Sequence, residues 1–393
     1  MSQQLISRNA DLQKLRTDGF DVHVKGSYLV MRGVPYVNGS KEVLRGTLVS
    51  ELSLAGDDTI RPSTHVVYFA GEYPCNADGS ELTKIRHQSV ETHLDRDLTV
   101  HHSFSSKPPG GYFDHYEKMT TYAAIISSAA RLIDPGATAQ TFPVIEAEDE
   151  DSAFRYLDTA SGRAEIKAVT RKLELKKLSI VGVGGTGSYV LDLTAKTPVK
   201  EIHLFDGDRF QQHNAFRSPG SASADELRVL PYKVDYFERI YSKMHRGIVP
   251  HAYHLDASNV AQLREMEFVF LCIDKGEAKK LIVGKLEEWG TSFIDVGMGV
   301  ELTDDALGGV LRVTTSTVQK REHVKEKHRI PFTDGDGNNE YSRNIQIADL
   351  NALNAALAVI KWKKLFGFYR DLDREHFTTY TIDGNQLLNE DHA

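Results

Sequence analysis

Cysteine is scarce in this chain of 393 residues, which contains only Cys75 and Cys272. Two cysteines form at most one disulfide, so a scaffold held together by several disulfides is excluded, and a structural zinc site with four cysteine ligands is excluded as well. Low cysteine content is typical of proteins in a reducing compartment, so we expect a cytoplasmic location.

Long hydrophobic runs are also missing. No apolar run approaches the roughly 20 residues that cross a bilayer, and residues 1–15 lack the hydrophobic segment of a signal peptide. We therefore expect neither a membrane-spanning helix nor a secretory leader.

The chain has no excess of positive charge. Its 47 lysines and arginines are outnumbered by 55 aspartates and glutamates, which gives a net charge of −8. Because a nucleic-acid-binding face needs concentrated basic residues, this composition argues against nucleic acid as the main partner. With 40% hydrophobic and 26% charged residues the composition is that of a globular protein, and the length predicts two or three domains.

An acidic run, Glu146–Ser152, separates two regions of different pattern. We interpret residues 146–151 as a linker, and the alternative is a solvated loop within one domain. Residues 1–145 are predicted to form an α+β domain, because strand-like segments precede a helical pattern at Tyr116–Ile133. The predicted strands of this domain include residues 20–24, 27–31 and 63–69.

Residues 152–393 alternate short apolar strands with helices. This pattern is typical of a Rossmann-like, doubly wound α/β sheet with right-handed crossovers. A stripe of leucine and isoleucine in Asp349–Lys363 is interpreted as the core face of a late helix. The predicted strands are residues 175–184, 201–206, 267–274 and 292–297.

A glycine-rich loop follows the first of these strands and precedes a helix. Gly182 permits a tight turn, Gly184 leaves room for a phosphate beside the backbone, and Gly187 lets helix and strand pack closely. The N–H groups at the helix N-terminus attract an anion, so we expect this loop, Gly185 included, to bind a nucleotide. No Lys-Ser or Lys-Thr pair follows the glycines, which excludes a P-loop.

Asp206 ends the second predicted strand, where an acidic residue about 20 positions beyond the loop is expected to contact the ribose hydroxyls. The loop and Asp206 together fit NAD, FAD or ATP. A nicotinamide- or flavin-dependent oxidoreductase is therefore one alternative.

Further polar residues follow the loop in the order Asp206, Asp208, Asn214, Arg217, Lys233 and Asp274. Together with the glycines they resemble the ThiF/MoeB and ubiquitin-activating-enzyme superfamily, whose members use ATP and Mg²⁺ to adenylate the C-terminal carboxylate of a ubiquitin-like protein. The resemblance runs from Ser152 to the end, includes a late helix at residues 344–360, and implies the fold of the ubiquitin-activating adenylation domains.

The resemblance implies a role for each residue of this set. Asp206 would bind ribose, Asn214 would help to hold the ribose and phosphates, and Asp208 would assist as a neighbouring carboxylate or Mg²⁺ helper. The catalytic cations would be Arg217 and Lys233, which neutralise the triphosphate.

Two further roles are implied by the resemblance. Asp274 would hold Mg²⁺. An arginine ahead of the glycine strand, Arg163 in preference to Arg155, would reach the site of a second subunit, so the resemblance also implies a homodimer.

The sequence departs from the family where a catalytic cysteine is expected. Thr314–Arg343 contains none and is interpreted as a mobile crossover loop. Cys272 lies in an apolar strand and is predicted to be buried, and Cys75, beside a turn, is the other candidate nucleophile. We expect direct transfer of the acyl group from the adenylate to a separate, conjugating-enzyme-like acceptor. The available hydroxyl nucleophiles are Ser316, Thr317, Thr333 and Ser342.

The N-terminal domain offers fewer signals. Asp95, His101, His102 and His115 lie in or near a polar, aromatic stretch, but adjacent histidines point to opposite faces of a strand, which favours structural histidines over a metal site. We expect a partner surface here, because the arrangement resembles that of bacterial proteins with an extra N-terminal domain on a ThiF-like core, which accompany ubiquitin-like and conjugating-enzyme-like proteins. A catalytically silent scaffold that only binds such partners is a further alternative, which the complete charged set argues against.

Overall fold

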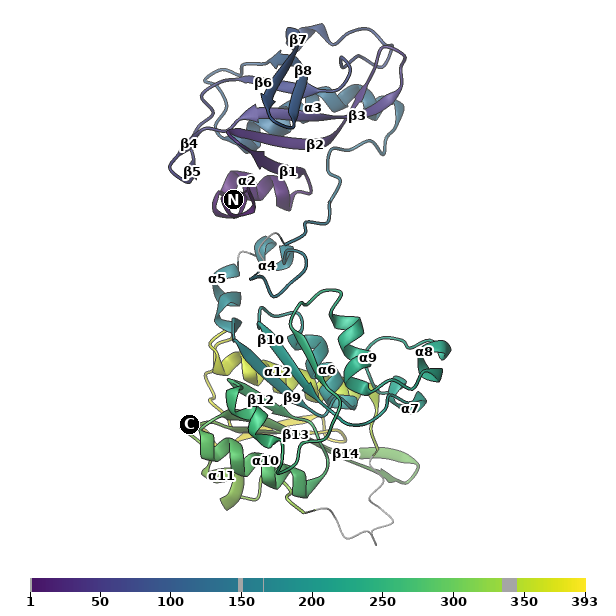
Figure 1. Ribbon diagram of the computed structural model, residues 1–393, viewed down its shortest axis with the longest axis vertical. Helices are drawn as coiled ribbons and strands as arrows, with labels where there is room; N and C mark the ends of the chain where they lie inside the picture. Colours follow the sequence, from purple (N-terminus) through teal and green to yellow (C-terminus); the bar gives the residue numbers. More distant parts are fainter. Residues whose placement is uncertain (1, 148–150, 165, 334–344) are drawn as a thin grey trace. The chain divides into compact units, whose positions relative to one another are not determined.

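The computed structural model describes residues 2–147, 151–164, 166–333 and 345–393 (Figure 1). The chain divides into two compact units, Met1–Glu148 and Asp149–Ala393. Each unit has its own hydrophobic core, and each is described by itself.

The first unit is an antiparallel sheet covered by a helix. The strands follow the order β1-β2-β3-β6-β8-β7 in the part of the unit that is described. Helix α3 packs on β2 and β3, and the short helices α1 and α2 precede the sheet (Figure 1). The elements are α1 (Ser2–Arg8), α2 (Ala10–Thr17), β1 (Asp21–Lys25), β2 (Tyr28–Val37), β3 (Val43–Glu51), β4 (Leu54–Ala55), β5 (Asp58–Thr59), β6 (Val66–Ala70), β7 (Arg86–Asp95), β8 (Leu98–Ser105) and α3 (His115–Ile133).

Helix α3 illustrates how the sequence forms this unit. The side chain of Asp114 caps its first turn by accepting a hydrogen bond from the backbone of Glu117. Met119, Tyr122 and Ile126 recur at helical spacing and are all buried against the sheet. The predicted helix and the predicted α+β arrangement are therefore confirmed.

The second unit contains a mixed sheet with the strand order β11-β10-β9-β12-β13-β14-β15-β16 among the described residues. The pairs from β11 to β13 are parallel, and those from β13 to β16 are antiparallel. The chain starts in the middle at β9, adds β10 and β11 on one side, and then crosses to β12 and β13 on the other. The strands are β9 (Lys177–Val181), β10 (Glu201–Phe205), β11 (Ile248–His251), β12 (Phe268–Leu271), β13 (Ser292–Thr303), β14 (Ala306–Ser316), β15 (Phe377–Thr381) and β16 (Gln386–Glu390).

Both faces of the parallel half are buried. On β12, Phe268 and Phe270 belong to the core formed with α6 and α12, whereas Val269 and Leu271 belong to the core formed with α10. Helices α10 and α12 thus cover opposite faces, and the predicted doubly wound sheet is confirmed (Figure 1). The helices are α4 (Thr159–Arg163), α5 (Lys167–Thr170), α6 (Gly185–Thr194), α7 (Gln212–Ala215), α8 (Ala224–Arg228), α9 (Lys233–Tyr241), α10 (Gly276–Trp289), α11 (Glu322–Glu326) and α12 (Ala348–Leu365).

The interpretation of Thr314–Arg343 as one loop is wrong in its first half. Residues up to Ser316 belong to β14, which forms a long hairpin with β13, and Glu322–Glu326 forms α11. The hairpin was missed because its tip, Asp304-Asp305, turns with both residues in the left-handed region rather than with a glycine. Residues 334–344, with Ser342, lie outside the described residues.

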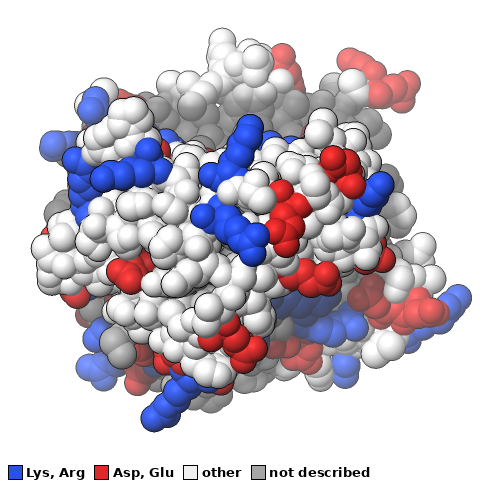
Figure 2. Space-filling model, turned by 90° about the horizontal axis from the view of Figure 1, so that it is seen from above, with Lys and Arg blue, Asp and Glu red and all other residues white. Residues whose placement is uncertain are grey.

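Two expectations from the sequence concern the distribution of surface charge and the presence of membrane-spanning helices. Acidic and basic side chains lie interspersed on the face shown in Figure 2, with no continuous basic field in that view. Of the helices formed by described residues, none is both long and apolar enough to span a membrane.

Candidate active site

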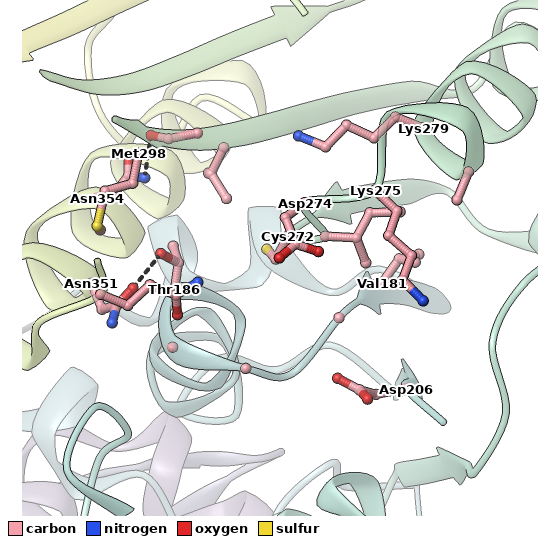
Figure 3. A pocket seen from close by; sticks show the side chains of 18 of the residues that line it. Val181, Thr186, Asp206, Cys272, Asp274, Lys275, Lys279, Met298, Asn351 and Asn354 are labelled. Carbon is pink, nitrogen blue, oxygen red and sulfur yellow. Dashed lines mark hydrogen bonds between the residues drawn. The ribbon is translucent and has the colours of Figure 1, made fainter. Parts of the chain in front are cut away.

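A pocket of about 730 Å³ lies at the carboxyl ends of β9, β10 and β12 (Figure 3). This is the point where the chain reverses its direction of strand addition, the usual ligand site of an open α/β sheet. Its wall combines the glycine loop with the segments that follow β10 and β12, and with parts of β13, β14 and α12.

The glycine loop shapes one wall of the pocket. Gly182 has a φ of +88°, and a side chain there would lie 2.8 Å from the carbonyl oxygen of Cys272. Gly184 precedes α6 and borders open space, whereas a side chain at Gly187 would overlap the carbonyl oxygen of Gly182. Gly182, Gly184 and Gly185 line the pocket, while Gly187 does not and serves the packing of α6 on β9.

Asp206 connects the glycine loop to the segment after β10. Its Oδ2 accepts a hydrogen bond from the backbone N–H of Val183, and its Oδ1 accepts one from the backbone N–H of Asp208, both at 2.9 Å. The carboxylate is buried yet lines the pocket. Asp206 therefore holds the loop in shape as well as placing a negative group at the pocket wall.

Lys233 begins α9 and joins the two aspartates. Its Nζ donates to Asp208 Oδ2 at 2.7 Å and lies 3.6 Å from Asp206 Oδ2. Burial alone would raise the pKa of Asp208, but the hydrogen bond and charge of Lys233, with His254 and Lys275, lower it. Both Asp208 and Lys233 line the pocket.

Arg217 lines the pocket from the segment after α7. Burial lowers the pKa of its guanidinium, while the charges of Asp274 and Asp208 act in the opposite direction. Its Nε is buried and has no hydrogen-bond partner among the described residues, so it remains available to a ligand. An unmet buried donor of this kind fits an anion such as a phosphate.

Asn214 precedes Arg217 by three residues and does not line the pocket. It is buried, and its Oδ1 accepts a hydrogen bond from the backbone of Gln211 as part of the cap of α7. Its carbonyl oxygen accepts a hydrogen bond from the backbone of Arg217 at 3.1 Å. In this geometry Asn214 supports the turn that carries Arg217.

Asp274 lies in the exposed turn between β12 and α10 and faces the pocket (Figure 3). Arg163 ends α4, and its side chain lies outside the described part of the structure. The alternative arginine, Arg155, donates from Nε to the carbonyl oxygen of Ser242 within its own unit. The structure therefore brings together Asp206, Asp208, Arg217, Lys233 and Asp274 with three of the four glycines.

Several lining residues were missed by sequence reasoning. Asn351 accepts a hydrogen bond from Thr186 at 2.8 Å and fixes α12 beside the glycine loop (Figure 3). Asn354, fully buried one turn later, donates to the carbonyl oxygen of Gly297 at 3.0 Å. Lys275, Lys279 and Arg312 also line the pocket and were not predicted.

The leucine and isoleucine stripe predicted as the core face of α12 is wrong: Ile360 is exposed and Leu350, Leu353 and Leu357 are only partly buried. The two asparagines instead share the buried face with Ala355, Ala358, Val359 and Trp362.

Neither cysteine has the environment of a nucleophile. Cys272 lines the pocket, but burial, followed by the negative charge of Asp295, raises the pKa of its thiol well above the usual range. Cys75 is buried, its Sγ donates to the carbonyl oxygen of Tyr73 at 3.4 Å, and burial raises its pKa. Among the hydroxyl alternatives, Ser316 and Thr317 are buried, and Thr333 is exposed.

The histidines of the first unit take part in local contacts. His115 is buried and accepts a hydrogen bond from the backbone of Ser53. His101 accepts one from Gly71, and His102 lies 3.1 Å from the hydroxyl of Ser89. Within the described ranges, no group of three or more histidine, cysteine, aspartate or glutamate side chains is arranged to hold a metal ion.

Two family models match parts of the chain. Residues 160–310, which lie within the second unit, match the ThiF family. Residues 10–159 match a domain of unknown function, DUF6791. No curated protein sequence matches the chain.

The solved structures to which the chain is similar include E. coli MccB with MccA-N7isoASN, at 18% identity and a TM-score of 0.43, over 57% of this chain and 67% of that one. PaaA is similar at 15% identity and a TM-score of 0.45, over 57% of this chain and 75% of that one. The microcin C7 biosynthetic enzyme MccB in complex with N-formylated MccA is similar at 19% identity and a TM-score of 0.45, over 57% and 67%.

Proposed function

We propose that the second unit uses ATP to adenylate the C-terminal carboxylate of a ubiquitin-like protein and releases pyrophosphate. The observation that carries the proposal is the meeting of Arg217, Lys233 and Asp274, from three separate segments, beside a glycine loop in the region that matches the ThiF family. An oxidoreductase would need the loop and Asp206 but would leave these three residues without a role.

The chemistry uses charge more than covalent participation by the protein. A carboxylate oxygen of the substrate attacks the α-phosphorus of ATP, a new P–O bond forms, and the bond to the departing pyrophosphate breaks with its electron pair. Negative charge grows on the phosphate oxygens. Arg217, with its unmet Nε, and Lys233 stabilise that charge, and the N–H groups at the start of α6 contribute to the same effect.

Magnesium fits the acidic residues of the pocket. Mg²⁺ is usually bound by one or two carboxylates together with substrate phosphates, and Asp274 and Asp208 both line the cavity. These two residues would hold the ion, which would supply further positive charge for the phosphate oxygens.

The activated acyl group is proposed to pass directly to a separate, conjugating-enzyme-like acceptor. The raised thiol pKa of Cys272 and the burial of Cys75 support this step, because thioester formation needs a thiolate. We further propose that the first unit recruits a partner protein, and that Arg163 completes the site of a second copy in a homodimer.

The test compares nucleotides first and then measures the reaction. Calorimetric titration should show binding of ATP in preference to NAD and FAD. ATP–pyrophosphate exchange should appear when a ubiquitin-like protein encoded by a neighbouring gene is added, and Asp274→Ala should abolish it while leaving the circular dichroism spectrum unchanged. Preferred binding of NAD or FAD would favour the oxidoreductase, and ATP binding without exchange would favour a silent scaffold.

A further inference from the structure

A buried carboxylate, Asp295, lies behind the pocket wall on β13. It has no exposed surface, and two cations contact it: Lys279 Nζ lies 2.8 Å from its Oδ1, and Arg312 Nη2 lies 2.6 Å from its Oδ2. Lys279 and Arg312 both line the pocket. Two positive groups that share one carboxylate leave an excess of one positive charge at this wall.

The hairpin of β13 and β14 builds this cluster. Gly297 lies directly opposite Arg312 in the register, and a side chain at position 297 would lie 2.8 Å from Arg312 Nε. The missing side chain lets the guanidinium cross the strand to Asp295, which lies two residues away on the same face. Arg312 also donates from Nη1 to Thr314 Oγ1 at 2.6 Å and to the carbonyl oxygen of Arg329.

Lys279 is less fully paired than Arg312. Its side chain is 4% exposed, and among the described residues its ammonium group has one ion-pair partner, Asp295. An ammonium group carries three donors. Figure 3 shows Lys279 extending from α10 toward the middle of the cavity. A buried ammonium group with spare donors therefore faces the pocket.

Stability alone does not account for such a cluster. A buried ion pair seldom stabilises a fold more than apolar side chains of the same volume would. Adenylation, in contrast, brings two anions together, the phosphates of ATP and a carboxylate, and their repulsion must be offset. Lys233 is already shared between Asp206 and Asp208, so a further cation has a clear use.

We propose that Lys279 holds an oxyanion in this pocket, either a phosphate of the nucleotide or the carboxylate that is adenylated. Asp295 and Arg312 are positioning residues that fix the ammonium group at the wall. The inference rests on the proposed function and adds to it a binding residue outside the group that contains Arg217 and Lys233.

The test uses Lys279→Met in the full chain, with Lys280→Met as the matched control. Lys280 is the next residue on α10, is exposed, and does not line the pocket. One arm uses calorimetry to measure the dissociation constants of ATP, AMP and adenosine. The other arm measures the dissociation constants of N-acetylglycylglycine and of its C-terminal amide in the presence of a non-hydrolysable ATP analogue.

We expect Lys279→Met to lose at least tenfold in affinity for the anionic ligand, and Lys280→Met to bind it like wild type. A loss for ATP or AMP but not for adenosine identifies a phosphate as the anion. Loss of the preference for the dipeptide acid over its amide identifies a carboxylate. Lys279→Arg should retain part of the preference, and Asp295→Asn should weaken it without changing adenosine affinity, which a purely structural role would not produce.

Binding equal to wild type in both arms would overturn the proposal. If Lys279→Met alone does not fold, Lys279→Met combined with Asp295→Asn removes both charges together, and the same two outcomes apply to it. Failure of the wild-type protein to bind ATP and AMP would instead contradict the proposed function, so the two failures are distinguishable.

Discussion

Lys233 shows how one residue serves both the fold and the pocket. Its ammonium group is buried between Asp206 and Asp208, and Asp206 in turn receives hydrogen bonds from the glycine loop and from Asp208. The charge that we propose for catalysis thus also balances the charges of the wall. Replacing Lys233 should therefore affect stability and nucleotide binding together.

Lys233→Met should lower the free energy of unfolding of the second unit by about 2 kcal/mol near neutral pH. This is below the usual effect of breaking a buried pair, because Asp208 is half exposed. Lys233 lowers the pKa of Asp208 in the folded state, so the stabilisation is present above the unfolded pKa of about 4 and is lost as the pH falls below it. Urea unfolding of both proteins at pH 7 and pH 3.5 checks this, and an equal difference at the two pH values would contradict it.

The two cysteines lead to a second prediction at the residue scale. Because burial raises the pKa of both thiols, Cys272→Ala and Cys75→Ala should each retain ATP–pyrophosphate exchange within about twofold of wild type. Each should also retain acyl transfer to the acceptor. Loss of transfer with intact exchange in either variant would identify that cysteine as a thioester site.

At the scale of elements, the parallel half of the second sheet was predictable and the antiparallel half was not. Strands β9, β10 and β12 are short apolar runs buried on both faces, which is a strong sequence signal. The hairpin of β13 and β14 turns through two aspartates, so no glycine marked it. The same holds for the site residues. Arg217, Lys233 and Asp274 were predictable from the motif that resembles the family. Arg312 reaches Asp295 only because β13 pairs with β14 in this register, and Lys279 contacts Asp295 from α10, so neither contact was predictable.

The glycine loop offers a matched pair of variants for the junction of β9 and α6. Gly187→Ala would place a methyl group against the carbonyl oxygen of Gly182, so it should destabilise the second unit by about 1–3 kcal/mol. Gly184→Ala adds a methyl group in open space, so the unit should stay folded but bind ATP several-fold more weakly. Thermal unfolding with and without ATP separates the effects, and the reverse pattern would contradict these assignments.

At the scale of the whole molecule, the two units have separate cores. The core around Met119 and Tyr122 contains only residues of the first unit, and the core around Phe268 and Trp362 contains only residues of the second. We therefore expect each unit to unfold cooperatively and independently of the other.

Calorimetry of the intact chain should show two unfolding transitions. ATP at 100 times its dissociation constant should stabilise the second unit by about 2.7 kcal/mol and leave the unfolding temperature of the first unit unchanged. Lys280→Met, on the exposed face of α10, should behave like wild type. A single transition, or an equal shift of both, would show that the units unfold together.

Burial raises the pKa of the Cys272 thiol at the pocket wall, and this has a consequence for the use of ATP. If the acyl-adenylate forms there, no cysteine of the enzyme takes over its acyl group as a longer-lived thioester. Water therefore competes with the acceptor for the acyl-adenylate until the acceptor reacts with it. ATP consumption should then exceed conjugate formation when the acceptor is scarce, and the ratio of the two would measure how well the site excludes water.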